Sequence, residues 1–534
     1  MTKSTFNVYA VMLSTISCRL TTLRKPNLAT DSFSIIRCLS DTVGTLKNIR
    51  PFESIPGPNG LYSLPYIGSI LHYKPFTDIP ALEINELQKR LHEQYGDILK
   101  FRVGSGWIVG LFHPDLCREA LQQTQPRYPL RFPVWILRKY AERNGIEEGI
   151  GTVNGKSWEA VRKPTQNEIL KPSSMATFDS SINQVSDDMV ARLKEQSRID
   201  DTLHTLYNYA IENIGMLCFN TRLGCLEGGE KADDIIEHVA FIFHALEVDL
   251  RSSFHWYKYF RTPYYKKFEK SYSILKRMLQ PEVDQCILRY QHDQTQGKQV
   301  PGHYIPCLVD NLLSGGKLTD AQLNSFIIDL FLSGIDSTAK TMSLILYRLA
   351  LHQDKQEKLY EEIKAHGLAD GQPITNEILH SMRYLKACIR ESLRIQFPIS
   401  GGYITATQSD IVVGHYKIPE KTLVMVACPT MIQDQRFFVD NDKYIPERWL
   451  RANDFMSDTY KSLNSFAFLP FGFGRRSCLG QRFAERELQI GITKLIQNFA
   501  VSLPRDVTKL TWEYRVFATP SGKLTLDLEC RNKT

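Results

Sequence analysis

The chain has 534 residues, of which 43% are hydrophobic and 23% are charged. This is an ordinary globular composition with enough apolar material for a large core. The formal charge of +7 is modest, and basic residues are interspersed with acids, so nucleic acid is not expected as a partner. The eleven cysteines show neither a CxxC pair nor a regular spacing. A zinc site or a disulfide framework is therefore not expected, and a reducing compartment is favoured.

The first thirty residues contain no Asp or Glu and carry Lys3, Arg19, Arg24 and Lys25 among many Ser and Thr. This composition is typical of a mitochondrial transit peptide, and a disordered tail that lacks acids is the alternative. No stretch of the chain supplies the roughly 18 apolar residues that a membrane span needs. We assign residues 1–50 to a transit peptide or disordered N-terminus.

The folded part begins where Pro and Gly punctuate residues 51–60. Alternating β-branched residues then predict a pair of strands at residues 98–104 and 106–112. From about residue 115 to residue 395 the pattern is mostly helical, and after Phe397 short strands and turns follow. The expected fold is mainly α with a smaller β region.

One expected helix is unusually long and apolar. Thr319 and Gln322 form a plausible capping box at its start, and the apolar pattern predicts a single helix over residues 320–351. At 1.5 Å per residue its length is about 48 Å, so it must cross the centre of the molecule. The polar residues 333–338 lie near its middle. Such a cluster is costly in a buried helix unless it has a function or forms a satisfied kink, and the segment alone leaves both open.

The most informative segment, residues 471–480, has the sequence FGFGRRSCLG and leads into a helix at about Gln481. Its glycines allow tight turns and close approach to a flat cofactor. Cys478 precedes the helix N-terminus, where the dipole favours a thiolate. A thiolate is the ligand that pushes electron density onto haem iron, and Arg476 suits a bidentate pair with a haem propionate.

This segment resembles the cysteine loop of the cytochrome P450 family. Phe471, Gly474, Arg476, Cys478 and Gly480 fill every fixed position of that pattern. A lone cysteine would more often be a small buried hydrophobe. Five fixed positions within ten residues leave that alternative little weight.

Further motifs of the family stand in the family's order. Glu391 and Arg394 match its E-x-x-R pattern on a helix, and Arg448 matches the arginine that joins them in a buried network bracing the cysteine loop. Alone, Glu391 and Arg394 would be an ordinary surface pair. Trp158 and Arg162 match the W-x-x-x-R helix, whose Trp and Arg meet a propionate. The resemblance implies a cytochrome P450 fold and a haem domain over residues 51–534.

The resemblance also implies a role for the long central helix. Its polar cluster is similar to the family's oxygen-activation motif, with Asp336 as the acid and Ser337 as the hydroxyl that deliver protons. The family usually has Thr at the second position, and Ala or Gly where this chain has Ser333. Thr338 offers another hydroxyl, about 100° further round the helix.

A second departure concerns a contact to the cofactor. Thr405 occupies the position where many mitochondrial relatives have a propionate-binding arginine. The sequence does not identify the residue that replaces this arginine.

The resemblance implies a monooxygenase that contains haem b and hydroxylates a lipophilic substrate with O2. A sterol or ecdysteroid substrate is preferred over a general detoxification role, because residues 127–140 and the cysteine loop look similar to mitochondrial P450s of animals. Two alternatives stay open: a P450-fold enzyme that rearranges peroxides or isomerises its substrate, and a haem-binding sensor without turnover. Neither would need the pairing of Asp336 with a hydroxyl.

The similarity to mitochondrial P450s also implies an adrenodoxin-like ferredoxin as electron donor. Lys386 and Arg390 share one helix face and match the positions where such P450s present basic residues to the ferredoxin. Arg482, after the cysteine loop, looks like part of the same group. Solvated helix charges are the plain alternative.

A peripheral membrane contact is expected at residues 254–261 and 264–267, which mix aromatics with cations. Aromatic rings and basic side chains are both stabilised at a membrane interface. Aromatic side chains packed into the core are the alternative. The expected location is mitochondrial, on the surface of the inner membrane.

Overall fold

The computed structural model describes most of the chain after residue 48. The described ranges are residues 49–80, 83–125, 127–169, 172–252, 254–296, 307–368, 372–450, 465–505 and 510–531. Apart from Ile49 and Arg50, the expected N-terminal segment of residues 1–50 lies outside them.

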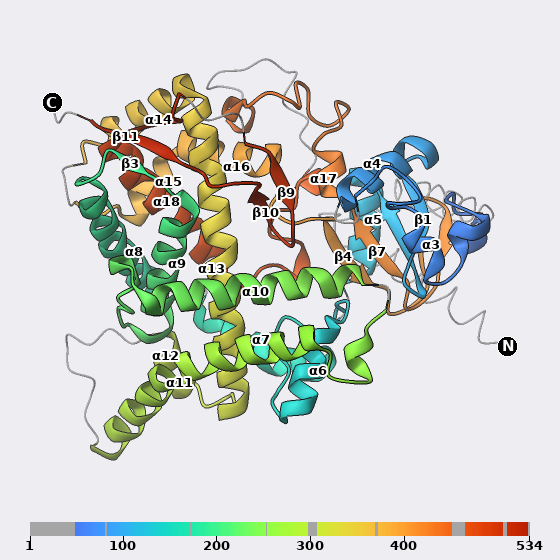
Figure 1. Cartoon of the computed structure of the whole chain (residues 1–534), viewed down its shortest axis with the longest axis horizontal. Helices are drawn as coiled ribbons and strands as arrows, with labels where there is room; N and C mark the ends of the chain where they lie inside the picture. Colours follow the sequence, from blue (N-terminus) through green and yellow to red (C-terminus); the bar gives the residue numbers. More distant parts are fainter. Residues whose placement is uncertain are drawn as a thin grey trace, which may run out of the picture.

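The molecule has a large helical part and a smaller part built around a β-sheet (Figure 1). The helices are α3 (Ile67–Ile70), α4 (Ile84–Tyr95), α5 (Pro114–Gln123), α6 (Trp135–Asn144), α7 (Gly155–Ile169), α8 (Pro172–Leu193), α9 (Thr202–Phe219), α10 (Glu230–Arg251), α11 (Pro263–Gln296), α12 (Leu308–Ser314), α13 (Asp320–Leu351), α14 (Gln353–Ala365), α15 (Asn376–Ser381), α16 (Arg383–Ile395), α17 (Cys428–Met431) and α18 (Gln481–Asn498). In Figure 1 the sheet lies to the right with α4 and α5, and α8, α9 and α18 lie to the left.

The largest sheet has four strands in the order β1-β2-β7-β4. Its strands are β1 (Ile98–Val103), β2 (Gly106–Leu111), β4 (Tyr403–Ala406) and β7 (Leu423–Val426). The β1–β2 hairpin confirms the strand pair that the sequence predicts, and β2 pairs with β7 in parallel. The sheet therefore joins the N-terminal strands to a segment about 300 residues further along the chain.

Three smaller sheets complete the β structure. They pair β5 (Ile411–Val413) with β6 (Tyr416–Ile418), β9 (Trp512–Tyr514) with β10 (Ala518–Pro520), and β11 (Leu526–Cys530) with both β3 (Arg198–Ile199) and β8 (Phe499–Ser502). Most strands after Phe397 are short, as the sequence predicts. The observed fold is mainly helical with a smaller β region, as expected.

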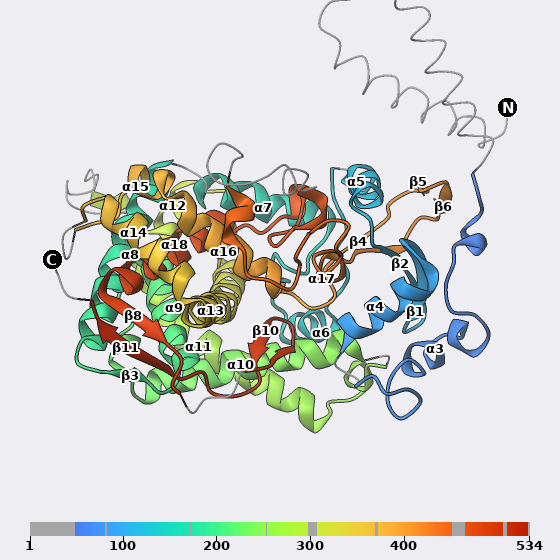
Figure 2. The same ribbon diagram turned by 90° about the horizontal axis from the view of Figure 1, so that it is seen from above.

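Helix α13 passes through the middle of the molecule and is seen along its axis in Figure 2. It begins at the predicted capping box, because the Gln322 N–H donates to Thr319 Oγ1 at 3.2 Å and the Thr319 N–H donates to Gln322 Oε1 at 3.1 Å. Most of its side chains are buried. The helix continues unbroken through residues 333–338, so the polar cluster is not a break in the helix.

Candidate active site

The cysteine loop turns tightly into α18. The Cys478 N–H donates to the Phe471 carbonyl at 2.8 Å, and the Ser477 N–H donates to the Gly474 carbonyl at 3.1 Å. Gly474 has φ +67°, where a side chain would be strained. These bonds place Cys478 just before the first turn of α18, as the sequence predicts.

The Cys478 side chain is exposed, yet protein atoms closely surround its thiol. Burial raises the pKa of its thiol, which the Gly480 N–H and the nearby Arg162 and Arg131 guanidinium groups lower in part. A thiol that is both accessible and strongly desolvated borders a space inside the fold. Cys478 is therefore available to an iron that enters that space.

Three arginines lie near this thiol: Arg131, Arg162 and Arg476. Burial, together with repulsion from Arg131, lowers the pKa of Arg162 to about 10 and that of Arg476 to about 9. Among the described residues, no carboxylate lies within ion-pair distance of any of the three. Buried cations without counter-ions are costly, so the cluster fits a cofactor that brings its own carboxylates. Haem, with its two propionates, is such a cofactor.

Arg476 is held mainly by the protein itself. Its guanidinium donates to the carbonyls of Pro129, Ile150 and Val153 and to Oδ1 of Asn154 at 2.8–3.4 Å. These bonds use four of its five N–H groups. The expected bidentate pair with a propionate is thus not available in this conformation, because only one donor remains.

Trp158 and Arg162 lie on α7, as expected. The Trp158 ring is buried, and the Arg476 guanidinium lies 4.2 Å from its centroid. Arg162 donates from Nε to Gln166 Oε1 at 2.9 Å, which leaves its other N–H groups for a ligand. The structure therefore brings Trp158, Arg162, Arg476 and Cys478 together in one site.

Arg131 is a member of the site that sequence reasoning missed. An antiparallel bridge joins Leu130 to Ala406, so Arg131 stands opposite Thr405, the position without the expected arginine. Thr405 Oγ1 donates to the Leu130 carbonyl at 3.4 Å, and Arg131 Nη2 donates to the Arg476 carbonyl at 3.1 Å. The signal was present in the sequence as a lone arginine in an apolar stretch, but only the bridge shows which position it faces.

Glu391, Arg394 and Arg448 form a buried network. Arg394 donates from Nε and Nη2 to the two Glu391 oxygens at 2.9 and 2.8 Å, and Arg448 Nε donates to Glu391 Oε1 at 3.0 Å. Trp449 Nε1 adds a bond to Glu391 Oε2 at 2.9 Å. The Trp449 ring contacts Phe468, which lies just before the cysteine loop, with centroids 5.1 Å apart. The network thus supports the segment that leads into this loop.

The polar residues of α13 point in different directions. Ser333 is exposed and Ser337 is partly exposed, and Ser337 Oγ donates to the Ser333 carbonyl at 2.5 Å. Asp336 is buried: its Oδ1 accepts from Tyr207 on α9, and its Oδ2 accepts from Lys340 Nζ at 2.8 Å. The expected acid and hydroxyl are therefore adjacent in sequence but lie on different faces of the helix.

Thr338 is also buried and faces away from Ser337. Its Oγ1 donates to Glu487 Oε2 on α18 at 3.2 Å. Glu487 is buried, and burial raises the pKa of its carboxyl well above the usual value. Of the two candidate hydroxyls, only that of Ser337 lies on an accessible face of α13.

The expected docking cations lie at the junction of α16 and α18. Arg390 is exposed, whereas Lys386 is partly buried and donates from Nζ to the His380 carbonyl at 3.0 Å. Lys386, Arg482 and Arg486 line one surface pocket of about 710 Å³. Burial lowers the pKa of Lys386, and Arg486 and Arg390 lower it further by repulsion. The cations of the two helices thus belong to one surface.

The aromatic segment at residues 254–267 divides between surface and core. Phe254, Trp256, Tyr259 and Phe260 are 45–74% exposed. Tyr257 and Tyr265, by contrast, are buried and stack with centroids 5.3 Å apart, so for these tyrosines the expected surface position is wrong. In the part of the chain that the structure describes, no helix is long and apolar enough to cross a membrane.

The comparisons agree with this geometry. A family model described as Cytochrome P450 matches residues 58–528. Probable cytochrome P450 49a1 of Drosophila melanogaster is 30% identical over 519 residues, covering 91% of this chain and 84% of that protein. The mitochondrial 1,25-dihydroxyvitamin D(3) 24-hydroxylase of Rattus norvegicus is 27% identical, covering 87% of this chain and 86% of its own. The mitochondrial sterol 26-hydroxylase of Oryctolagus cuniculus is 26% identical, covering 87% of this chain and 88% of that protein.

The family match over most of the chain and an accessible Cys478 in a complete cysteine loop lead to one conclusion: the chain belongs to the cytochrome P450 family and is a haem-thiolate monooxygenase.

Proposed function

We propose that this monooxygenase is a mitochondrial hydroxylase of a lipophilic, sterol-like substrate and receives its electrons from an adrenodoxin-like ferredoxin. The observation that carries the proposal is the group of four cations, Lys386, Arg390, Arg482 and Arg486, on one surface of α16 and α18, where the acids Asp179, Glu377 and Glu485 also line the pocket. Helix α18 begins directly after the loop of Cys478. A donor that docks on this surface would lie close to the loop whose Cys478 would hold the cofactor.

The cofactor is proposed to be haem b, whose iron the Cys478 thiolate would hold. Bound haem supplies the iron at which dioxygen is activated. Arg131 and Arg162 would neutralise its propionates, and Trp158 would lie beside them. Arg476 would mainly hold the surrounding loop, because most of its donors are already used. In Cys478→Ser, the red-shifted Soret band of the ferrous–CO complex should be lost.

Ser337 and Asp336 are the residues proposed to handle protons. Ser337 presents a hydroxyl on an accessible face of α13, and Asp336 lies buried one turn before Lys340. This arrangement supports hydroxylation over the two alternatives, because peroxide rearrangement and non-catalytic haem binding need no proton delivery. Asp336→Asn should retain haem and lose hydroxylation; a wild-type protein that binds haem but hydroxylates no lipophile with O2 and reduced ferredoxin would favour those alternatives.

The electron-donor proposal rests on charge complementarity. Lys386 and its neighbours repel one another, so an acidic partner relieves that repulsion when it binds. Complementary charge mainly raises the rate of encounter and makes it sensitive to salt. Arg486 already has an acidic neighbour, since Asp179 lies 3.7 Å from it. Lys386 and Arg390 are therefore the residues to change.

The test is stopped-flow reduction of the holoenzyme by a reduced adrenodoxin-type ferredoxin. Lys386→Glu with Arg390→Glu should slow reduction at low salt by about tenfold or more while the haem spectrum stays unchanged. Lys89→Glu with Arg277→Glu, a charge reversal on α4 and α11, serves as the matched control. Reduction of the first variant at the wild-type rate, or turnover supported only by a diflavin reductase, would overturn the proposal.

We also propose that the protein rests on a membrane through an aromatic patch, defined as Phe254, Trp256, Tyr259 and Phe260. A second group of exposed apolar side chains lies near it in the N-terminal part of the fold: Leu61, Leu64, Tyr66, Ile67, Ile70 and Phe76. The Tyr66 and Phe254 rings, 6.5 Å apart, link the two groups. Exposed apolar surface of this extent is typical of an interaction site.

Vesicle co-sedimentation of the holoenzyme tests the membrane proposal. Trp256→Ala with Phe260→Ala should weaken binding to vesicles that contain anionic lipid by about tenfold. Leu288→Ala is the control, because Leu288 is an exposed apolar residue of α11 outside the aromatic patch. Absence of binding, or equal binding by all three proteins, would count against a membrane contact.

The proposed substrate class and location follow from the relatives. Two of them are named as mitochondrial hydroxylases, of 1,25-dihydroxyvitamin D(3) and of a sterol. A sterol or ecdysteroid is therefore preferred over a general detoxification role. A screen for substrate-induced shifts of the haem spin state, with sterols, ecdysteroids and unrelated lipophiles side by side, separates these roles. Equal responses to all lipophiles would favour detoxification.

A further inference from the structure

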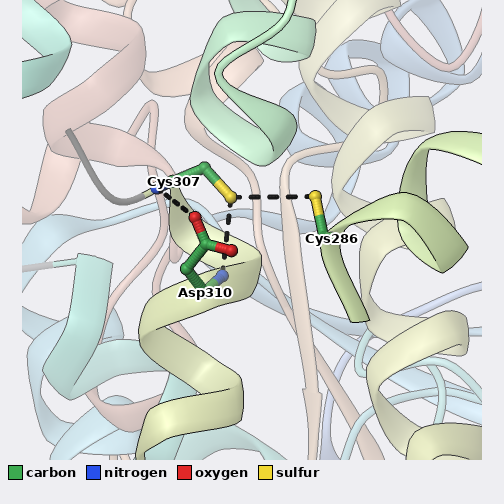
Figure 3. A group of neighbouring side chains, drawn as sticks. All are labelled: Cys286, Cys307 and Asp310. Carbon is green, nitrogen blue, oxygen red and sulfur yellow. Dashed lines mark hydrogen bonds between the residues drawn. The ribbon is translucent and has the colours of Figure 1, made fainter. Parts of the chain in front are cut away.

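Two buried cysteines meet at the junction of α11 and α12. Cys286 lies on α11 and Cys307 is the N-cap residue of α12, 21 positions further along the chain. Their Sγ atoms are 4.0 Å apart and point toward one another (Figure 3). Both side chains are almost completely buried. No part of the proposed oxygen chemistry uses them.

The two thiols are not equivalent. Arg289 Nη2 donates to Cys286 Sγ at 2.9 Å, which places a positive charge directly on this sulfur. Cys307 Sγ accepts the Asp310 N–H at 3.4 Å, and Asp310 Oδ2 accepts the Cys307 N–H at 2.9 Å. The bond from Cys307 and the Arg289 charge lower the pKa of Cys286, whereas the bond to Cys286 and burial raise that of Cys307. Cys286 is therefore the more acidic thiol of the pair, and Cys307 is the less acidic one.

A metal ion is the competing explanation, since both sulfurs and an Asp310 oxygen lie within 4.8 Å of one another. Two observations argue against it. The Arg289 guanidinium already contacts the Cys286 sulfur that a cation would need. The Asp310 carboxylate caps α12 through the Cys307 N–H, and the described residues supply only three of the four ligands of a structural zinc site.

We propose that Cys286 and Cys307 form a redox-active pair that a small two-electron oxidant such as hydrogen peroxide converts into a disulfide between α11 and α12. Cys286 is the attacking thiolate and Cys307 the resolving thiol. Arg289 activates the first, and the N-cap geometry of α12 holds the second in place. The short distance between the sulfurs makes the second step intramolecular.

The chemistry balances in two steps. The Cys286 thiolate attacks one peroxide oxygen, the O–O bond breaks, and a sulfenic acid forms as hydroxide leaves. The Cys307 sulfur then attacks the Cys286 sulfur, the S–O bond breaks, and the disulfide forms as the Cys307 proton and the hydroxyl leave as water. With the hydroxide protonated by the proton that Cys286 first released, two thiols and one peroxide give one disulfide and two waters. Dithiothreitol reverses the change.

The position of the pair gives the disulfide a structural effect. Helix α12 packs against α7, which carries Trp158 and Arg162, and α11 packs against α13. A covalent bond between α11 and α12 would therefore connect the helix that packs against α13 with the helix that packs against α7. The cross-link also restricts the unfolded chain between the two cysteines, so the oxidised protein is more stable than the reduced protein.

The test treats the ferric holoenzyme with one equivalent of hydrogen peroxide and analyses a non-reducing digest by mass spectrometry. Wild type should give a linked peptide that contains Cys286 and Cys307, and its thermal midpoint should rise by about 2–4 °C. Cys307→Ser should stop at the first step, so dimedone should trap a sulfenic acid at Cys286. Cys225→Ser is the control, because Cys225 is buried without a partner thiol in hydrogen-bond contact and burial raises its pKa to about 11.

Three results would overturn the proposal. The first is that peroxide oxidises Cys286 no faster than Cys225, as measured in the same digest. Another is a Cys307→Ser variant without a dimedone adduct at Cys286. The third is one equivalent of zinc in the purified holoenzyme that disappears in Cys286→Ser. None of these results bears on the ferredoxin or substrate proposals, which are tested by reduction rates and haem spectra.

Discussion

Lys340 and Asp336, one turn apart on α13, form an ion pair of 2.8 Å whose two side chains are almost fully buried. Tyr207 donates to the other oxygen of the same carboxylate. The acid of the oxygen-activation motif is thus held on the α9 side of the helix. Lys340 from the same helix and Tyr207 from α9 together set the position of Asp336.

Removing Lys340 should destabilise the fold. Lys340→Met leaves the Asp336 carboxylate buried without its cation, so the free energy of unfolding should fall by about 3–5 kcal/mol. Urea unfolding of the holoenzyme measures this. Adding Asp336→Asn should recover most of the loss, since no unpaired charge remains, and Lys340→Arg should change stability little. Equal losses in the single and double variants would show that the pair is not coupled.

The two hydroxyls of α13 should differ in effect. Ser337→Ala should lower kcat about 10–100-fold with the haem spectrum unchanged, because it removes the hydroxyl on the accessible face. Thr338→Ala should keep kcat within about twofold but lower the free energy of unfolding by about 1–3 kcal/mol, because buried Glu487 loses its donor. Single-turnover kinetics and urea unfolding separate the two. A larger loss of kcat in Thr338→Ala would reverse the assignment.

Arg131 should help to retain the cofactor. A charge-assisted hydrogen bond contributes about 1.5–3 kcal/mol, so Arg131→Leu should release haem to apomyoglobin about tenfold faster. Arg127→Leu, at an exposed arginine paired with Glu159, is the control. Because Arg131 stands opposite Thr405, adding Thr405→Arg to Arg131→Leu should restore slow release. Failure of that rescue would mean that the two positions do not serve the same ligand.

Glu487 makes stability depend on pH. Burial raises the pKa of its carboxyl in the folded protein. The contribution of this carboxyl to the free energy of unfolding is therefore fully present below its pKa in the unfolded chain, near 4.3. This contribution is lost as the pH rises through the pKa in the folded protein. Glu487→Gln keeps an acceptor for Thr338 and cannot ionise. We expect it to raise the free energy of unfolding at pH 8 by about 1–2 kcal/mol and to flatten its decline above pH 5. A variant that is less stable at pH 8 than wild type would contradict this.

Much of the helical frame follows from local sequence signals. The capping box at Thr319 fixes the start of α13 through bonds within four residues, and alternation with a two-residue turn fixes the β1–β2 hairpin. The spacing of Glu391 and Arg394 is enough to pair them on one helix. In each case the interacting groups lie within one turn or one hairpin, where the chain itself sets the geometry.

The features of the site that the sequence did not predict depend on contacts between segments that are far apart in the chain. The aromatic pattern at residues 254–267 does not distinguish Trp256, which is exposed, from Tyr257, which is buried. The packing of α11 determines which of the two side chains is buried. The helical period places Ser337 and Thr338 about 100° apart, but only the position of α18 shows which of them faces Glu487. The approach of Cys286 to Cys307 likewise depends on how α11 and α12 pack.

The bridge between Leu130 and Ala406 has a consequence for comparing members of this family. A column-by-column comparison with relatives that have Arg at this position would record a lost cation at position 405, although Arg131 stands opposite it on the neighbouring segment. If Arg131 and an arginine at position 405 serve the same ligand, the requirement is for one cation on either of two adjacent backbone segments. Relatives with Thr at the one position are best searched for Arg or Lys at the other.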